Sequence, residues 1–524
     1  MDTKALRQKI LELAIRGKLV PQDPNDEPAS VLLERIRAEK QQMVKDGRLK
    51  AKDVKNDTII FVGEDNLHYE KFADGTVKCI EDELPFEIPE GWAWDRLSNI
   101  AAFSSGKTPS TSHREFWDGN VLWVTSKDMK SKYITSSLLM LSEKGASQMQ
   151  LYPPETILMV TRSGILRHTL PVAILKSEAT ANQDIKAICL YDCSLAEWVY
   201  SCLKGMEDRL LLRYTKSGTT VENINFDEFK DVLLPIPPVS EKNQIIDRVQ
   251  EACKAVDVIE KEKTALEDVV VKAKALILDL AIRGKLVPQD SDDEPASVLL
   301  ERIRAEKEEL IKQGKIKRDK RESVIFRGED NSYYLRTGDL VESLADWELE
   351  ELPDNWSICC LGEVCDYGAC INVDTSTIDD SAWILDLEDI EKDTGNVLTR
   401  IKKADRASAS TKHRFHKGQV LYSKLRPYLN KVVLADQDGY CTSEILPLEF
   451  NSIILPEYAR YYLMSPSFLR YANRCSYGVK MPRLGTEDGK KAIIPVPPVR
   501  EQAEIVGLVR SAFQYLDGIT ANLN

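Results

Sequence analysis

Short clusters of basic, hydroxyl and glycine residues recur in two stretches, 84–238 and 352–498, called here the first and second insert. Lys and Arg suit phosphate oxygens, Ser and Thr add hydrogen bonds, and Arg can pair bidentately with guanine in the major groove. Taken alone, each such residue is more typical of a solvated surface, but as groups they favour nucleic-acid binding. The candidates are Lys107, Thr108, Thr125, Lys127, Arg162, Lys216, Thr219 and Thr220, followed by Lys412, Arg414, Lys424, Arg426, Tyr428, Lys480 and Arg483.

The overall charge argues against a nucleic-acid binder, but its distribution weakens the objection. The formal net charge is −13, whereas contact with phosphates rewards Lys and Arg. Residues 400–491 nevertheless hold 17 Lys and Arg against 8 Asp and Glu. One basic segment within an acidic chain is compatible with a local DNA surface or with an ordinary mixed surface.

Residues for catalysis are harder to find. The Pro-Pro pairs at 153, 237 and 497 lack the preceding Asn of an adenine methyltransferase loop. The chain has neither a Gly-x-Gly cofactor loop nor a G-x-x-x-x-G-K-[ST] phosphate loop. Glu228-Phe229-Lys230 resembles part of a nuclease motif, but that spacing is common by chance. The five histidines are scattered, so we expect no catalytic site, metal or cofactor in this chain.

Internal repetition organises the sequence. Leu13–Lys40 and Leu280–Lys307 differ only at Pro24/Ser291 and Asn25/Asp292. Weaker echoes follow at Phe61/Phe326 and at the Pro-Pro segments that close the two inserts. Repeated frames that enclose unmatched inserts predict one scaffold presenting two different readers. The expected domains are 1–83, 84–238, 239–351, 352–498 and 499–524, where the first, third and fifth are helical frames.

A long helix is predicted after Pro238, ending near Gly284. Apolar residues alternate by four and three, which is typical of a coiled coil. The two ends of the chain each carry half of this pattern, so we expect both to pack antiparallel on the central helix. The short amphipathic helices at 31–40 and 298–310 suggest packing on the frame or a repeated docking surface. The predicted spacer and docking positions are Ile245, Val249, Val256, Ile259, Leu266, Ile277, Ile505, Val509 and Leu516.

The inserts mix short apolar runs with polar turns, and helical stretches lie near 196–213 and 456–473. The expected fold class is therefore α+β. Each insert would form a twisted, mostly antiparallel sheet, and the two would be joined by a pseudo-two-fold antiparallel coiled coil of long helices. The N-terminus lacks a signal-peptide core and no apolar run could span a membrane. The 11 cysteines form no regular framework, which indicates a cytoplasmic location.

These segments resemble the specificity subunits of Type I restriction–modification enzymes over nearly the whole chain. The resemblance rests on Leu84–Trp94, Ser105–Asp128, Lys417–Val433 and the two helix starts PIPPVSEKNQII and PVPPVREQAEIV. Asn243 departs from the Glu or Gln that the family usually has near this point. The segment ahead of the first insert resembles the branch that carries a conserved region there.

The resemblance implies two target-recognition domains, each reading half of a split, asymmetric site in double-stranded DNA. It also implies that the helical frames set the gap and dock two modification subunits, which use S-adenosylmethionine to methylate adenine. Two restriction subunits can join them, with ATP and magnesium. Two alternatives remain open: a phage-defence scaffold that binds proteins without its own DNA specificity, and a nuclease with a degenerate motif.

Overall fold

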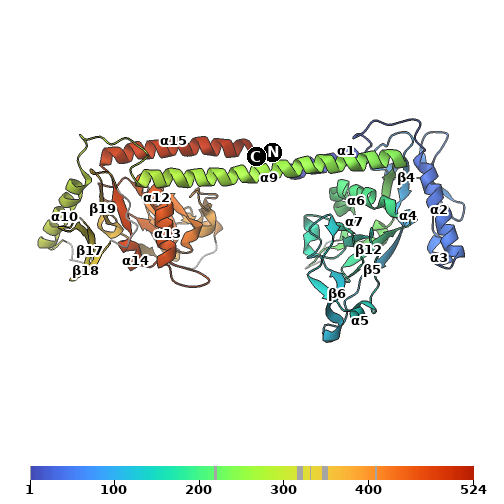
Figure 1. The fold of residues 1–524 in the computed structure, drawn as a ribbon, viewed down its shortest axis with the longest axis horizontal. Coiled ribbons are helices and arrows are strands. Elements are labelled where there is room, and N and C mark those ends of the chain that lie inside the picture. The colour runs from blue at the N-terminus through green and yellow to red at the C-terminus, as the bar shows by residue number, and fades with distance from the viewer. Residues whose placement is uncertain are drawn as a thin grey trace. The chain divides into compact units, whose positions relative to one another are not determined.

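The computed structural model describes residues 2–216, 221–315, 323–330, 332–344, 352–406 and 410–523. The chain divides into two compact units, Met1–Glu262 and Lys263–Asn524. The boundary falls within one continuous helix, α9 (Val239–Ile282), which begins directly after Pro237-Pro238. Each unit contains one insert together with the frame segments that precede and follow it, and these segments are called the frame of that unit (Figure 1).

The frame of the first unit combines helices with a small sheet. The helices are α1 (Thr3–Ile15), α2 (Ala29–Lys45) and α3 (Ala51–Val54). An antiparallel sheet then follows, formed by β1 (Ile59–Val62), β2 (His68–Lys71) and β3 (Val77–Cys79). The second unit repeats this order with α10 (Ala296–Lys312), β16 (Ser323–Arg327), β17 (Tyr333–Thr337) and β18 (Leu340–Ser343).

The first insert is built around a five-stranded sheet in the order β5-β12-β9-β10-β7. Its strands are β5 (Ala101–Ser105), β7 (Tyr133–Ile134), β9 (Ile157–Val160), β10 (Val172–Leu175) and β12 (Ile185–Leu190). A second sheet contains β6 (Trp117–Val124), β8 (Leu139–Leu141) and β11 (Ala179–Ala181), and two further pairs join β4 (Ala93–Arg96) to β15 (Leu233–Ile236) and β13 (Thr215–Lys216) to β14 (Asn223–Ile224). The helices are α4 (Leu97–Ile100), α5 (Glu143–Ala146), α6 (Ala196–Gly205), α7 (Glu207–Tyr214) and α8 (Phe226–Phe229).

The second insert also combines a five-stranded sheet, a three-stranded sheet and short helices. Its five-stranded sheet contains β20 (Ile371–Val373), β23 (Lys412–Phe415), β26 (Gly439–Thr442), β21 (Trp383–Leu385) and β22 (Ile401–Lys402). Beside it lie β25 (Val432–Leu434), β24 (Val420–Ser423) and β27 (Ile445–Leu448), and β19 (Ser357–Cys360) pairs with β28 (Ile493–Val496). The helices are α11 (Leu361–Val364), α12 (Pro456–Met464), α13 (Pro466–Cys475) and α14 (Thr486–Lys491), and the chain continues into α15 (Val499–Leu523).

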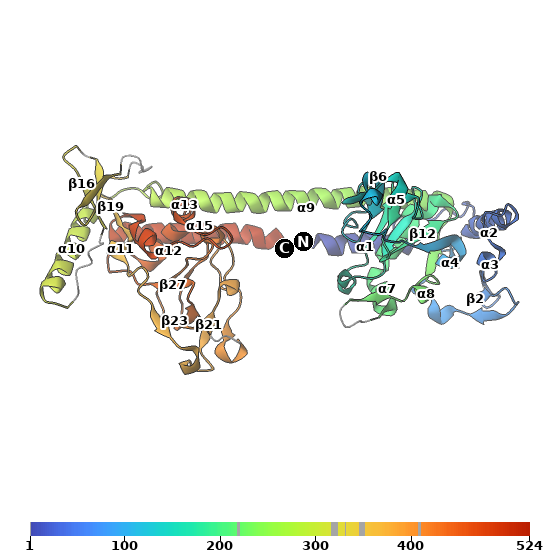
Figure 2. The same ribbon diagram turned by 90° about the horizontal axis from the view of Figure 1, so that it is seen from below.

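Each unit packs one terminal helix antiparallel against its own half of α9. In the first unit Arg7 of α1 forms ion pairs with Asp257 and Glu260. In the second unit Lys274 of α9 forms an ion pair with Asp517 of α15. Figures 1 and 2 both show α1 and α15 running beside these two halves of α9.

Each insert is fastened to its own helix start by one aromatic side chain. Trp198 of α6 donates a 2.7 Å hydrogen bond to the carbonyl oxygen of Pro235, and Tyr458 of α12 donates a 2.9 Å bond to that of Pro495. Both side chains are fully buried. The proline segments that repeat in the sequence therefore have the same role in both units: the carbonyl oxygens of Pro235 and Pro495 accept a hydrogen bond from the insert.

Glycine is required at one repeated turn of the frames. Gly17 and Gly284 have φ values of +63° and +64°, in the left-handed region that glycine adopts readily. A Cβ atom there would lie 2.4 Å from Cγ of Pro89 or Pro353, respectively. This close approach explains why the Arg-Gly-Lys turn stays identical in the two copies.

The predicted α+β fold with mostly antiparallel sheets and antiparallel terminal helices is confirmed within each unit. The frames differ from the prediction because each also holds a three-stranded sheet. In the first frame the turn between β1 and β2 contains Gly63 and Asn66, and Asn66 has a left-handed φ of 62°. Of the predicted spacer residues, Ile245, Val249, Val256, Ile505 and Val509 are buried, Ile259, Ile277 and Leu516 are partly buried, and Leu266 is exposed.

Candidate nucleic-acid interface

In the first insert, the loop that follows β9 is held against a hairpin formed by β13 and β14. The backbone N–H of Thr161 donates to the carbonyl of Asp184 at 2.8 Å, and Thr161 accepts from the N–H of Ile224 at 2.8 Å. The N–H of Ser163 donates to the carbonyl of Glu222 at 3.2 Å. We call residues 161–164 the strand-end loop, and the described residues 215–216 and 221–224 the hairpin, of the first insert.

The second insert reproduces this network with different side chains. The N–H of Lys424 donates to the carbonyl of Glu444 at 3.0 Å, and Lys424 accepts from Leu484 at 3.0 Å. The N–H of Arg426 donates to the carbonyl of Pro482 at 2.7 Å. Residues 424–428 are the strand-end loop here and residues 477–484 the hairpin.

The matching hydrogen bonds align the two inserts residue by residue, although their sequences show no visible match. Val160 and Ser423, each the last residue of a strand, face Ile185 and Ile445. Thr161 therefore corresponds to Lys424, and Ser163 to Arg426. The bridge between Arg162 and Asn223 corresponds to the one between Leu425 and Arg483. One backbone scaffold thus presents different side chains at equivalent places in the two inserts.

Several candidates of the first insert lie together at the strand ends on one side of its five-stranded sheet. β12 pairs antiparallel with both β5 and β9, so the end of β5, the start of β12 and the end of β9 meet. Lys107 and Arg162 emerge there and are exposed. Thr108 donates a hydrogen bond to the side chain of Gln183, a residue that sequence reasoning missed.

Thr125 and Lys127 follow β6. The hydroxyl of Thr125 donates to Asp128 at 2.7 Å, which shapes the turn, and the side chain of Lys127 is exposed. Lys216 is exposed and pairs with Asn223 in the hairpin. Thr219 and Thr220 lie outside the described residues. Arg167, also missed, forms a 2.7 Å ion pair with Glu222 and supports the hairpin.

Arg426 has an unusual environment for a surface arginine. Its φ of +49° is left-handed, and Pro427 follows it at the start of a short 3-10 turn. Its Nε is buried and has no hydrogen-bond partner within the described ranges. A strained backbone and an unsatisfied donor are costly unless a ligand uses them. Lys424 precedes it, partly buried, and Tyr428 is exposed.

The hairpin of the second insert presents both charge and apolar surface. Arg483 forms a 2.9 Å ion pair with Glu444, which raises its pKa, and Lys480 is exposed. Val479 is fully exposed, and more than half of Tyr477 and about half of Met481 are also accessible. The sequence predicted the basic residues Lys480 and Arg483. The exposure of Val479 and Met481, called here the apolar tip, becomes apparent only in the structure.

Lys412 is the candidate that the structure moves away from the surface. It is only 2% exposed and its Nζ lies 3.4 Å from Asp386, so it neutralises a carboxylate inside the insert. Its neighbour Arg414 is exposed on β23. Alternation along β23 places Lys412 and Arg414 on one face and His413 on the other, so the burial of Lys412 follows from its local surroundings and not from the strand period.

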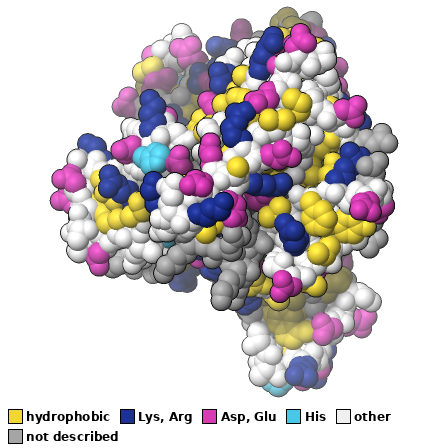
Figure 3. All heavy atoms as spheres, turned by 90° about the vertical axis from the view of Figure 1, so that its left-hand side faces the viewer, with side chains coloured by type: hydrophobic (Ala, Val, Ile, Leu, Met, Phe, Trp, Pro, Cys, Tyr) yellow, Lys and Arg dark blue, Asp and Glu magenta, His cyan; other side chains and the backbone are white. Residues whose placement is uncertain are grey.

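The face drawn in Figure 3 carries basic and acidic side chains interspersed, with hydrophobic side chains between them. Over the described part of the chain, no group of three or more His, Cys, Asp or Glu could hold a metal. None of the helices in that part is both long and apolar enough to cross a membrane. Of the alternative nuclease motif, Phe229 is buried, Glu228 is exposed, and Lys230 lies 3.9 Å from Asp227.

The family model and the similar proteins both point to the same family. The model of the Type I restriction modification DNA specificity domain matches twice, at residues 89–268 and 353–523. The EcoAI specificity subunit of Escherichia coli is 28% identical over 69% of this chain, and the EcoEI specificity subunit of Escherichia coli is 26% identical over 69%. The chain covers 62% and 61% of the lengths of these relatives.

Solved structures of similar proteins align over 84% of the chain. One, from a study of complex assembly and conformational transition of the type I R-M system, has a TM-score of 0.47 at 15% identity and is covered over 94% of its length. The HsdS subunit from Thermoanaerobacter tengcongensis has a TM-score of 0.37, also at 15% identity and 94% coverage.

Proposed function

Because this chain belongs to the Type I restriction modification DNA specificity family, we propose that it chooses the DNA site of such a system and carries out no chemistry itself. Each insert reads one half of a split, asymmetric site in double-stranded DNA. The observation that carries this proposal is the shared backbone network of the strand-end loops and hairpins. It supports two readers that have one geometry and different specificity.

The residues proposed to contact DNA are those that the network leaves at the surface. In the first insert they are Lys107, Thr108, Thr125, Lys127, Arg162 and Lys216, together with Thr219 and Thr220, which are retained from the sequence alone. In the second insert they are Arg414, Lys424, Arg426, Tyr428, Lys480 and Arg483. Lys412 is omitted because of its burial. Local basic loops of this kind are compatible with the acidic net charge of −13.

The repeated frames are proposed to dock two copies of one modification subunit. α2 and α10 bury equivalent leucines, Leu32 and Leu33 in one and Leu299 and Leu300 in the other. Their outward faces repeat the same charged residues. Arg35 pairs with Glu27 and Arg302 with Glu294, and more than half of each arginine side chain remains exposed. A shared partner would account for the identity of these exposed charges. S-adenosylmethionine would be bound by that partner, and ATP and magnesium by restriction subunits joining it, in the cytoplasm.

Both outcomes of the docking proposal can be measured by native mass spectrometry of the purified complex. Two modification subunits per chain are expected, and one or none would contradict the proposal. We further propose that the length of α9 sets the gap between the half-sites. This helix has 44 residues, each adding about 1.5 Å along its axis.

The decisive experiment for function is genome-wide methylation sequencing of a strain with this chain and its modification partner, compared with a strain lacking only this chain. A split N6-methyladenine motif that disappears with the chain is the expected result. Unchanged methylation, with the modification subunit active on DNA, would contradict DNA reading and favour the scaffold alternative. Exposed apolar residues of β1, such as Phe61 and Val62, would then become the first binding surface to test.

A further inference from the structure

A pair of arginines precedes each hairpin on a short helix. α7 carries Arg209 and Arg213, and α13 carries Arg470 and Arg474. In each pair the two residues are four positions apart and therefore share one helix face. Arg213 lies three residues before Lys216 of the hairpin, and Arg474 three residues before Tyr477, which occupies the equivalent bridge position.

A different face of each helix is anchored in the core of its insert. Leu210 and Tyr214 are buried on α7, and Phe468 and Ala472 are buried on α13. All four arginines are exposed. Since the inserts have diverged in sequence, a basic pair kept in the same place beside both hairpins is hard to attribute to packing.

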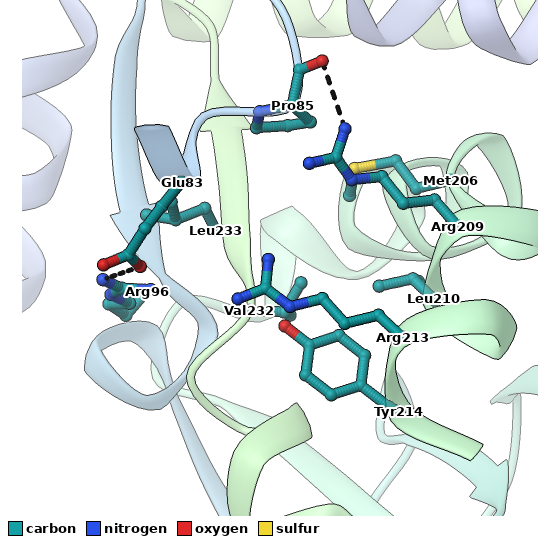
Figure 4. A pocket seen from close by; sticks show the side chains of 10 residues that line it. All are labelled: Glu83, Pro85, Arg96, Met206, Arg209, Leu210, Arg213, Tyr214, Val232 and Leu233. Carbon is teal, nitrogen blue, oxygen red and sulfur yellow. Dashed lines mark hydrogen bonds and ion pairs between the residues drawn. The ribbon is translucent and has the colours of Figure 1, made fainter. Parts of the chain in front are cut away.

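In the first insert the pair faces a shallow pocket. Arg96, Arg209, Arg213 and Tyr214 contribute to its lining, and Figure 4 shows the guanidinium groups of Arg209 and Arg213 directed to the same side of α7. Arg209 uses one nitrogen, Nη1, to donate a 3.3 Å hydrogen bond to the carbonyl oxygen of Pro85. Its remaining donors are available to a ligand.

The three arginines that line this pocket differ in whether a carboxylate neutralises them. Arg96 is neutralised by Glu70 and Glu83, at 2.7 and 2.8 Å. No carboxylate in the described part of the chain forms an ion pair with Arg209 or Arg213. In the second insert, α13 contains no Asp or Glu in its sequence PSFLRYANRC. Both helices therefore place two exposed arginines next to a candidate reading element.

We propose that the two arginine pairs bind phosphates of the DNA backbone beside each half-site, while the strand-end loops and hairpins read bases. This inference rests on the proposed function and adds a sequence-independent contact to it. Arginine presents a planar fork of donors that fits phosphate oxygens bidentately. Such contacts fix position and register but carry no sequence information.

The test uses the full chain in complex with its modification partner and DNA containing the native split site. Affinity is measured at several salt concentrations for the double variants Arg209→Gln/Arg213→Gln and Arg470→Gln/Arg474→Gln. Each lost phosphate contact lowers the slope of log K against log salt by about 0.9, so each double variant should lose about 2. The methylated motif should stay unchanged, and Lys in place of Arg should keep most of the slope.

The matched control is Arg114→Gln with Arg400→Gln, exposed arginines of the first and second insert that lie outside the strand-end loops, the hairpins and the proposed docking helices. The control should bind with the wild-type slope. An unchanged slope in the α7 and α13 variants would overturn the inference, even if the loss of the Pro85 contact lowers thermal stability. An altered motif would also overturn it, because the arginines would then read bases. If the wild-type complex shows no preference for the split site, the proposed function itself fails.

Discussion

The indole Nε1 of Trp92 donates a 2.8 Å hydrogen bond to Oε2 of Glu241, and both side chains are buried. Trp92 lies where the chain enters the first insert and Glu241 lies in the first turn of α9, so this bond joins the insert to its frame. Gln22 donates to the other carboxylate oxygen at 2.8 Å. The second unit repeats the arrangement with Trp356, Gln289 and Glu501.

Trp92→Phe should destabilise the first unit because it leaves a buried carboxylate oxygen without its donor. The expected loss is about 1–3 kcal/mol in the free energy of unfolding, measured by urea denaturation, and Trp356→Phe should act alike on the second unit. Trp117→Phe is the control, since Trp117 is only partly buried and bonds to an exposed carbonyl. Equal stability of all three variants would contradict a structural role for the two Trp–Glu bonds.

Asp95 of β4 should make the stability of the first unit depend on pH. Burial raises the pKa of this carboxyl to about 6, against the lowering effects of the Asn99 hydrogen bond and the Arg37 charge. A raised folded pKa means that the folded state holds the proton more tightly than the unfolded state. The stabilising effect of protonation is therefore present at low pH and is lost as pH rises from about 4 to about 6.

Asp95→Asn should remove this dependence. Over that window the wild type should lose about 3 kcal/mol relative to the variant, measured by urea denaturation at pH 4 and pH 7. Asp82→Asn is the control, because Asp82 is exposed in the same unit. If the wild type and Asp95→Asn lose stability in parallel, Asp95 does not carry a raised pKa.

The repeat made much of the frame predictable. Near identity of Leu13–Lys40 and Leu280–Lys307 required the same structure twice, and the four-and-three spacing after Pro238 correctly gave α9. The small sheets β1–β3 and β16–β18 were missed because their strands are short and their outer residues, such as Ile59, are exposed. A strand without a clear buried face gives little alternation to read.

The candidate site was only partly predictable for a related reason. Arg426 could be chosen by residue type, but its left-handed backbone and its bond to Pro482 depend on a hairpin more than fifty residues away. Lys412 looked like its basic neighbours, and only the position of Asp386 assigns it to the interior. Arg209 and Arg470 gave no sequence signal, since isolated arginines on helices are common.

The apolar tip of the second hairpin should contribute to recognition of one half-site. Val479 and Met481 project beside Lys480, where they can contact thymine methyl groups or sugar edges. Val479→Ser with Met481→Ser should weaken binding to the native site about tenfold, roughly 1.4 kcal/mol, in a fluorescence anisotropy titration. Leu398→Ser is the matched control, because Leu398 is 59% exposed in the same insert and lies outside its strand-end loop and hairpin. Equal losses for both variants would mean that the tip makes no specific contact.

Lys424 and Arg426 should be needed for the half-site read by the second insert and for nothing else. The test variant is Lys424→Ala with Arg426→Asn, because Asn tolerates the left-handed backbone at 426. Losing two charged contacts to bases or phosphates should reduce methylation of the native split site at least tenfold, measured by methylation sequencing. Assembly with the modification subunit, followed by native mass spectrometry, should be unaffected.

The first insert supplies the matched comparison, since Thr161 and Ser163 occupy the equivalent backbone positions. Because the Thr161 side chain is buried and Ser163 caps the turn that follows it, the variant changes two exposed neighbours instead. Lys107→Ala with Arg162→Ala should relax the other half of the motif and leave the half read by the second insert intact. Normal methylation of the native site by the Lys424/Arg426 variant would show that this loop does not read DNA. Loss of assembly would instead show that the loop supports the fold, because the modification subunit is proposed to dock on the frames and not on this loop.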